Sequence, residues 1–106
     1  MFRLEKASRR SGTYLTIEGE LKSESVGAAE SACQEALADS DGKAVTIVVR
    51  HVTEIDADGY SFLKRLIRTR ARVRAVGIYS QYVLRIIRNG GAAQFLQMRE
   101  PDVHKH

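Results

Sequence analysis

The sequence has little of what marks secreted, disulfide-stabilised or metal-thiolate proteins. Its 106 residues include one cysteine, one proline, no tryptophan and 7% aromatic residues. The single cysteine, Cys33, has no partner for an internal disulfide and no second thiolate for a metal site. Because it falls on the apolar face of a helical pattern, we expect Cys33 to be a buried core residue.

Long apolar runs are also missing. No stretch approaches the roughly 20 apolar residues that cross a bilayer. The first ten residues, MFRLEKASRR, lack the apolar centre of a signal peptide. We therefore expect no membrane insertion and a cytoplasmic location. Charged residues at 28% and apolar residues at 43% are typical of one water-soluble domain.

No catalytic set of residues can be assembled from the sequence. Two of its three histidines, His104 and His106, lie in the last three positions, and His51 is expected at the end of a strand. No glycine-rich phosphate loop with a following lysine is present. The sequence therefore predicts a non-enzymatic protein without a cofactor.

The clearest pattern in the chain lies between Ala44 and Leu66. Its first part is an unbroken β-branched run, which predicts a strand covered on both faces near the middle of a sheet: Val45, Ile47, Val48 and Val49. Asp56 follows at a helix N-cap position. Apolar residues then recur at helical spacing, at Phe62, Leu63, Leu66 and Ile67.

The residues before this stretch predict a hairpin and a helix. Alternation predicts a strand over residues 2–10 and, after a turn at Ser11-Gly12, a second strand over 13–21 with Leu15 and Ile17 facing the core. Apolar residues at spacings of three and four then predict a helix from Ser23 or Ser25, as the cap, to about Asp39. The buried side of this helix consists mostly of small side chains, which favours close packing on the sheet.

The residues after it continue the alternation of helix and strand. The expected elements are a helix over about 58–70, a strand over 73–79, a helix capped by Ser80 and ended by Asn89-Gly90-Gly91, and a short strand over 92–98. The fold class is therefore α/β, a mixed sheet with helices in the order strand-strand-helix-strand-helix-strand-helix-strand. Residues 1–98 are expected to form one domain and residues 99–106 a polar tail.

A buried strand followed by Ile55-Asp56-Ala57-Asp58-Gly59 and an amphipathic helix resembles the signature of the STAS family. This family includes anti-sigma factor antagonists and the tails of sulfate transporters. The resemblance covers residues 2 to about 98 and implies a STAS-like fold with a role in bacterial signal transduction and transcription regulation. It also implies a protein-binding face at the start of the second helix, made by Asp56, Ala57, Asp58, Gly59 and Ser61.

The chain departs from the family at its switch position. In STAS regulators the residue after the aspartate is typically a serine or threonine, which a partner kinase, itself the anti-sigma factor, phosphorylates to switch binding off. Here that residue is Ala57, which has no hydroxyl, so we expect binding without phosphorylation at this position. One hypothesis is that the fixed charge of Asp58 weakly imitates the phosphorylated state. Against it, one step along a helix turns the side chain by roughly 100°.

The resemblance leaves more than one partner open. A kinase-type anti-sigma factor or a sensor assembly is the first. The second is the ATPase of an ABC-type lipid or solute transporter, with this chain as its small cytoplasmic subunit. Such a subunit needs no phosphorylatable serine. A homodimer is also compatible with the sequence.

Basic and acidic clusters allow two further interpretations. The net charge is +4, and six basic residues lie between Lys64 and Arg74. They indicate either a solvated helix face or a nucleic-acid or nucleotide binder, and the small number of aromatic residues makes nucleic acid the less expected partner. The three carboxylates of Glu54, Asp56 and Asp58 allow the interpretation of a divalent-cation site, because carboxylates are hard oxygen ligands. A helix cap and a first-turn charge, worth roughly 0.3–1 kcal/mol, explain two of them without a metal ion.

Overall fold

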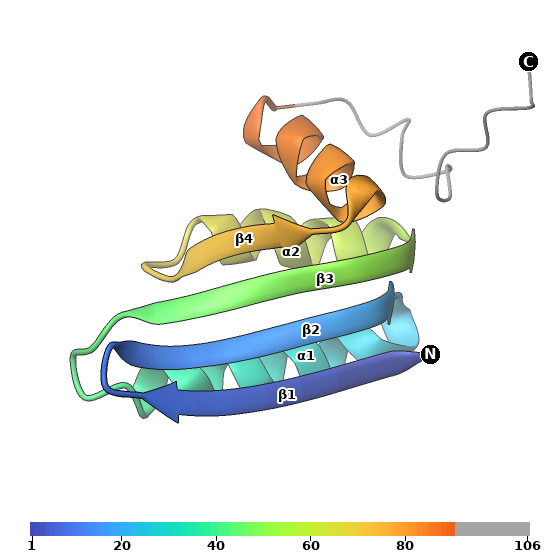
Figure 1. Cartoon of the computed structure of the whole chain (residues 1–106). Helices are drawn as coiled ribbons and strands as arrows, with labels where there is room; N and C mark the ends of the chain where they lie inside the picture. Colours follow the sequence, from blue (N-terminus) through green and yellow to red (C-terminus); the bar gives the residue numbers. More distant parts are fainter. Residues whose placement is uncertain (91–106) are drawn as a thin grey trace, which may run out of the picture.

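A four-stranded mixed sheet and three helices make up residues 1–90, the part of the chain that the computed structural model describes (Figure 1). In chain order the elements are β1 (Phe2–Arg9), β2 (Gly12–Leu21), α1 (Ser23–Ala38), β3 (Val45–Ile55), α2 (Ala57–Ile67), β4 (Arg72–Val76) and α3 (Ile78–Arg88). The predicted α/β class and the order of these seven elements are confirmed. The predicted strand over 92–98 and the tail over 99–106 lie outside the described residues.

The strands are ordered β1-β2-β3-β4 across the sheet. β1 and β2 form the predicted antiparallel hairpin, whereas β3 pairs in parallel with β2 on one side and β4 on the other. The predicted interior position of β3 is therefore confirmed. Since β2, β3 and β4 are parallel, their carboxyl ends lie at one edge of the sheet. A single residue then joins each of these strands to the helix that follows: Lys22, Asp56 and Gly77.

The core lies between the sheet and the three helices, of which α1 and α2 are behind the sheet in Figure 1. The side chains of Leu15 and Ile17 on β2 are buried against those of Ile47 and Val49 on β3, as the alternation predicts, and Phe62 of α2 is also buried. Burial of each such side chain stabilises the fold by roughly 1.5–3 kcal/mol. The predicted small residues of α1 face this core: Ala29, Cys33 and Ala36.

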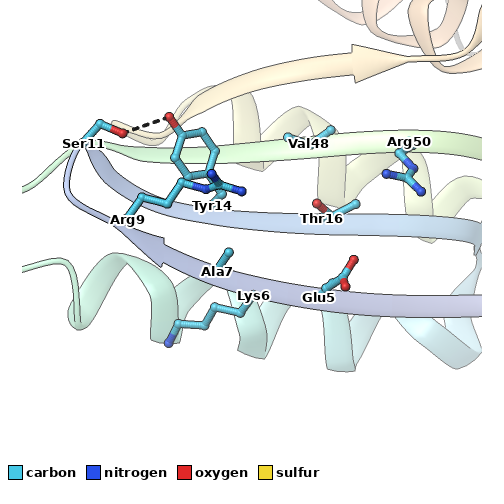
Figure 2. A pocket seen from close by; sticks show the side chains of 9 residues that line it. All are labelled: Glu5, Lys6, Ala7, Arg9, Ser11, Tyr14, Thr16, Val48 and Arg50. Atoms are coloured by element: carbon cyan, nitrogen blue, oxygen red, sulfur yellow. Dashed lines mark hydrogen bonds between the residues drawn. The ribbon is translucent and has the colours of Figure 1, made fainter.

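The prediction that β3 is covered on both faces is wrong for the described part of the chain. There, helices cover only one face of the sheet, and the other, hereafter the open face, carries residues such as Tyr14, Thr16 and Val48 (Figure 2). Thr46 and Val48 of β3 are nevertheless buried and half-buried. Side chains of the strands on both sides shield them, because β3 is an interior strand.

β3 is longer than expected because it contains a bulge. Glu18 of β2 pairs with Arg50, and Glu20 pairs with Glu54, so three residues of β3 lie opposite one residue of β2. His51, at the start of this bulge, has a φ of 49°. The expectation that His51 ends the central strand is therefore wrong, since β3 continues to Ile55.

The predicted start of α3 is also wrong. Gly77, with a φ of 102°, is the N-cap, and the helix begins at Ile78 rather than after Ser80. Ser80 is buried, and its Oγ accepts a hydrogen bond of 2.9 Å from the backbone N–H of Val52 in the β3 bulge. Because the hydroxyl is used there, it cannot cap the helix. β4 consequently ends at Val76, three residues earlier than predicted.

The other helix ends differ by smaller amounts. α1 has Lys22 at its N-cap, and Ser25 Oγ accepts a hydrogen bond from the Lys22 backbone N–H at 3.1 Å. Ser23 is thus the first helical residue and not the cap. α2 ends at Ile67 rather than near residue 70. Gly90 has the left-handed conformation predicted beyond the end of α3, with a φ of 70°.

Candidate functional site

The Asp56 carboxylate joins the starts of two helices. Its Oδ1 accepts a hydrogen bond from the backbone N–H of Gly59, and its Oδ2 accepts one from that of Ser23, each at 2.9 Å. The first contact is the predicted N-cap of α2. The second caps α1, whose sequence is remote from Asp56. An N-cap is worth roughly 0.5–2 kcal/mol, so this one side chain stabilises two helix starts at the same time.

Gly59 is required by the close approach of α2 to the end of β2. A Cβ at this position would lie 2.1 Å from the carbonyl oxygen of Leu21 and 2.8 Å from Cγ1 of Ile55. The backbone N–H of Asp56 also donates to the Leu21 carbonyl, at 3.2 Å. The Asp-x-x-Gly pattern is therefore explained by packing and hydrogen bonding inside the domain.

Three of the five predicted site residues remain accessible to a partner. Ala57, Asp58 and Ser61 are exposed, whereas Gly59 is buried and both carboxylate oxygens of Asp56 are engaged. Asp58 lies in the first turn of α2, where the helix dipole stabilises a negative charge. The start of α2 thus presents a small side chain, an anion and a hydroxyl to solvent.

An exposed isoleucine lies at the same edge of the sheet. Ile78, the first residue of α3, is 85% exposed, and Val76 just before it is 39% exposed. β3 and β4 are parallel, so α2 and α3 both begin on the carboxyl side of the sheet, although α3 starts beside His51, before the end of β3. The two helices contact each other. We call Ala57, Asp58, Ser61 and Ile78 the carboxyl-edge surface.

Sequence reasoning missed Ile78 because the strand was expected to continue through it. In an alternating strand, an isoleucine is an ordinary half-buried residue. The signal that separates the two cases is Gly77, which ends β4 and serves as the N-cap of α3. Glycine is acceptable at an N-cap, although serine ranks above it, and this ranking favoured Ser80.

The acidic cluster at the start of α2 is used within the fold. Glu54 forms an ion pair with Lys22 at 3.5 Å, and Asp56 caps the helices. Within residues 1–90, no group of three His, Cys, Asp or Glu side chains is placed to hold a metal ion. His104 and His106 lie outside the described residues.

The run of basic residues between Lys64 and Arg74 does not form one helix face. Lys64 and Arg65 lie on α2, and Arg65 pairs with Glu30 through hydrogen bonds of 2.9 and 3.1 Å. Arg70 donates to the Leu37 carbonyl at 2.8 Å and thereby satisfies the carboxyl end of α1. The last two, Arg72 and Arg74, lie on β4. The interpretation as a solvated helix face therefore holds only for the first half of the run.

Among residues 1–90, no helix has the length and the apolar character that crossing a membrane requires. In comparison with known proteins, no family model and no curated protein matches the chain.

Proposed function

We propose that this protein is a non-enzymatic, STAS-like regulatory domain of the bacterial cytoplasm that binds a protein partner through its carboxyl-edge surface. One observation carries the proposal. Asp56 and Gly59 are used inside the domain, whereas Ala57, Asp58 and Ser61 are exposed at the same edge as the 85% exposed Ile78.

The chemistry of this surface fits a protein partner. Burying the Ile78 side chain stabilises a complex by up to about 1.5–3 kcal/mol before the costs of association. The Asp58 carboxylate favours an arginine or lysine on the partner, and such pairs set orientation and association rate. The single methyl group of Ala57 lets another backbone approach the helix start closely.

A kinase-type anti-sigma factor, or a sensor assembly that contains one, is the partner that the resemblance implies. Because Ala57 cannot accept phosphate, binding is constitutive at this position. An ABC transporter ATPase is the alternative partner, and it would use the same surface without a switch. The identity of the captured protein separates the two.

The test is affinity capture from host lysate with the tagged full chain, followed by mass spectrometry. We expect a partner that the native chain retains and Asp58→Arg loses. The matched control is Glu35→Arg, which makes the same charge reversal at an exposed position near the other end of α1, away from the carboxyl edge. Equal loss of the partner by both variants, or retention by Asp58→Arg, would contradict the assignment.

A further inference from the structure

The open face gathers arginines that are far apart in the sequence. The strand register places Arg74 beside Val48, Arg72 beside Thr46, and Glu18 between Arg3 and Arg50. Strand alternation puts these side chains on the face that carries Tyr14 and Thr16, and Arg9 lies on it as well. Five arginines from three strands therefore share one surface: Arg3, Arg9, Arg50, Arg72 and Arg74.

The positive charge of this surface is only partly neutralised. Its acidic residues are Glu5, Glu18 and, towards the carboxyl end of β2 and β3, Glu20 and Glu54. Glu18 is shared by Arg3 at 3.2 Å and Arg50 at 3.9 Å, while Glu20 pairs with the N-terminal amino group and Glu54 with Lys22, each at 3.5 Å. Arg72 and Arg74 are exposed and have no carboxylate within 4.0 Å among residues 1–90. Within the described part of the chain, the β4 side of the open face thus presents two exposed guanidinium groups that no carboxylate neutralises.

A shallow hollow lies on the same face, between β1 and β3 (Figure 2). Its volume is about 640 Å³, and Tyr14, Arg9, Thr16 and Val48 are among the residues that line it. The Arg9 guanidinium lies 5.6 Å from the centre of the Tyr14 ring, and Ser11 Oγ is 3.3 Å from the Tyr14 hydroxyl. A planar group can stack against this arginine and tyrosine while hydroxyls offer hydrogen bonds.

We propose that the open face binds single-stranded nucleic acid. Phosphates would contact Arg72 and Arg74 on β4 and Arg3 on β1, and a base would stack in the Tyr14 hollow. Most basic residues on this face are arginines; Lys6 also lines the hollow but pairs with Asp39 of α1 at 3.8 Å. Guanidinium groups bind phosphate in bidentate fashion and also stack on planar rings, which ammonium groups do not. The combination of exposed guanidinium groups with a ring in a hollow favours nucleic acid over an acidic protein.

This surface is separate from the carboxyl edge, so the proposal does not depend on the partner proposed above. Sequence reasoning disfavoured nucleic acid because aromatic residues do not alternate with the basic run. In the fold, Tyr14 of β2 lies on the same face as Arg72 and Arg74 of β4. Strand pairing in the fold therefore brings together an aromatic residue and basic residues that lie far apart in the sequence.

The test is fluorescence anisotropy of the full chain with labelled single strands of oligo-dT and oligo-U of about 12 nucleotides, within the range of site sizes for one domain. Titrations at several salt concentrations give the affinity and its salt dependence. We expect Arg72→Ala/Arg74→Ala to weaken binding at least tenfold at low salt. The logarithmic salt slope should become less steep by about 1.4, since each phosphate contact contributes about 0.7.

Two sets of variants test whether the open face is the surface that binds the nucleic acid. Arg68→Ala/Arg85→Ala removes the same charge from exposed positions at the C-cap of α2 and on α3 and should bind as the native chain does. Tyr14→Leu should weaken binding about tenfold without changing the salt slope, because stacking is not electrostatic, whereas Tyr14→Phe should retain affinity. An equal loss of affinity in the two double-arginine variants would overturn the proposal. Full competition by poly-glutamate combined with no effect of Tyr14→Leu would overturn it in favour of an acidic protein ligand.

Discussion

The Oδ2 atom of Asp56 accepts a hydrogen bond of 2.9 Å from the backbone N–H of Ser23, a residue 33 positions earlier in the chain. With Oδ1 on Gly59 N–H, the carboxylate ties the β2–α1 junction to the β3–α2 junction. Two of the three helices that cover the core, α1 and α2, are thus fixed at the edge proposed to bind the partner. The stability of that edge and its capacity to bind can therefore be tested separately.

Replacing Asp56 should show that it caps two helices. Asp56→Ala removes both acceptors and should lower the free energy of unfolding by roughly 1–3 kcal/mol. Asp56→Asn keeps one oxygen for Gly59, but its amide nitrogen cannot accept a hydrogen bond from Ser23, so we expect about half of that loss. Urea denaturation measures both variants. An asparagine variant as stable as the native chain would show that the contact with Ser23 contributes nothing.

Gly59→Ala should destabilise the domain by about 2 kcal/mol or more, because the added methyl group overlaps the Leu21 carbonyl, which belongs to backbone and cannot move aside easily. Gly27→Ala serves as the comparison. Gly27 lies inside α1 with nothing within 4 Å of a new Cβ, so its replacement should stabilise by roughly 0.5–1 kcal/mol. If the two variants melt at the same temperature, steric conflict at Gly59 is not the reason for the glycine.

Ser80→Ala should cost about 1–3 kcal/mol, since it leaves the buried Val52 N–H without its acceptor in the β3 bulge. Ser31→Ala makes the same chemical change at an exposed position of α1 and should be close to neutral. Thermal denaturation followed by circular dichroism compares them. Equal stability of the two variants would show that the Ser80 hydroxyl does not stabilise the β3 bulge.

Cys33 should be unreactive in the folded protein. Burial, with a smaller contribution from Glu30, raises the pKa of its thiol from 9.0 to about 12. At pH 8 the thiolate population, and hence the rate of modification by a thiol reagent, should fall on the order of a thousandfold below that of the urea-unfolded chain. Rapid labelling without denaturant would contradict the burial of Cys33.

The same shift gives a pH dependence of stability. The folded pKa lies above the unfolded one, so the contribution of the neutral thiol is fully present below about pH 9. It is lost as the pH rises from 9 towards 12, because the unfolded chain ionises first. Cys33→Ser should reduce this loss between pH 9 and 11, which denaturation at several pH values measures.

Much of the fold was predictable because its signals are local. The β-branched run at Val45–Val49, the Asp56 cap and the alternation of Leu15 and Ile17 each follow from residues close in sequence, and the structure confirms the elements they predict. The start of α3 was not predictable in this way. The Ser80 hydroxyl is taken by Val52, 28 residues away, and no local rule reports that competition.

The start of α2 was predictable from the sequence, but the contacts made there were not. The pattern from Asp56 to Gly59 identified the start of α2, yet only the fold shows that Asp56 and Gly59 serve internal contacts. Ile78 reaches the same edge because β3 and β4 are parallel neighbours, which is a property of topology. The grouping of Arg3 and Arg50 with Arg74 on the open face likewise depends on strand register.

The most direct test of partner docking is hydrogen exchange of the full chain with and without the captured partner, resolved by mass spectrometry. The first amides of a helix lack intrahelical acceptors and exchange quickly, so protection there is easy to detect. We predict slower exchange at residues 57–61 and at the start of α3, with β1 unchanged. Protection limited to β1 or to the strands of the open face would show that the partner binds elsewhere and that the carboxyl edge is not the docking surface.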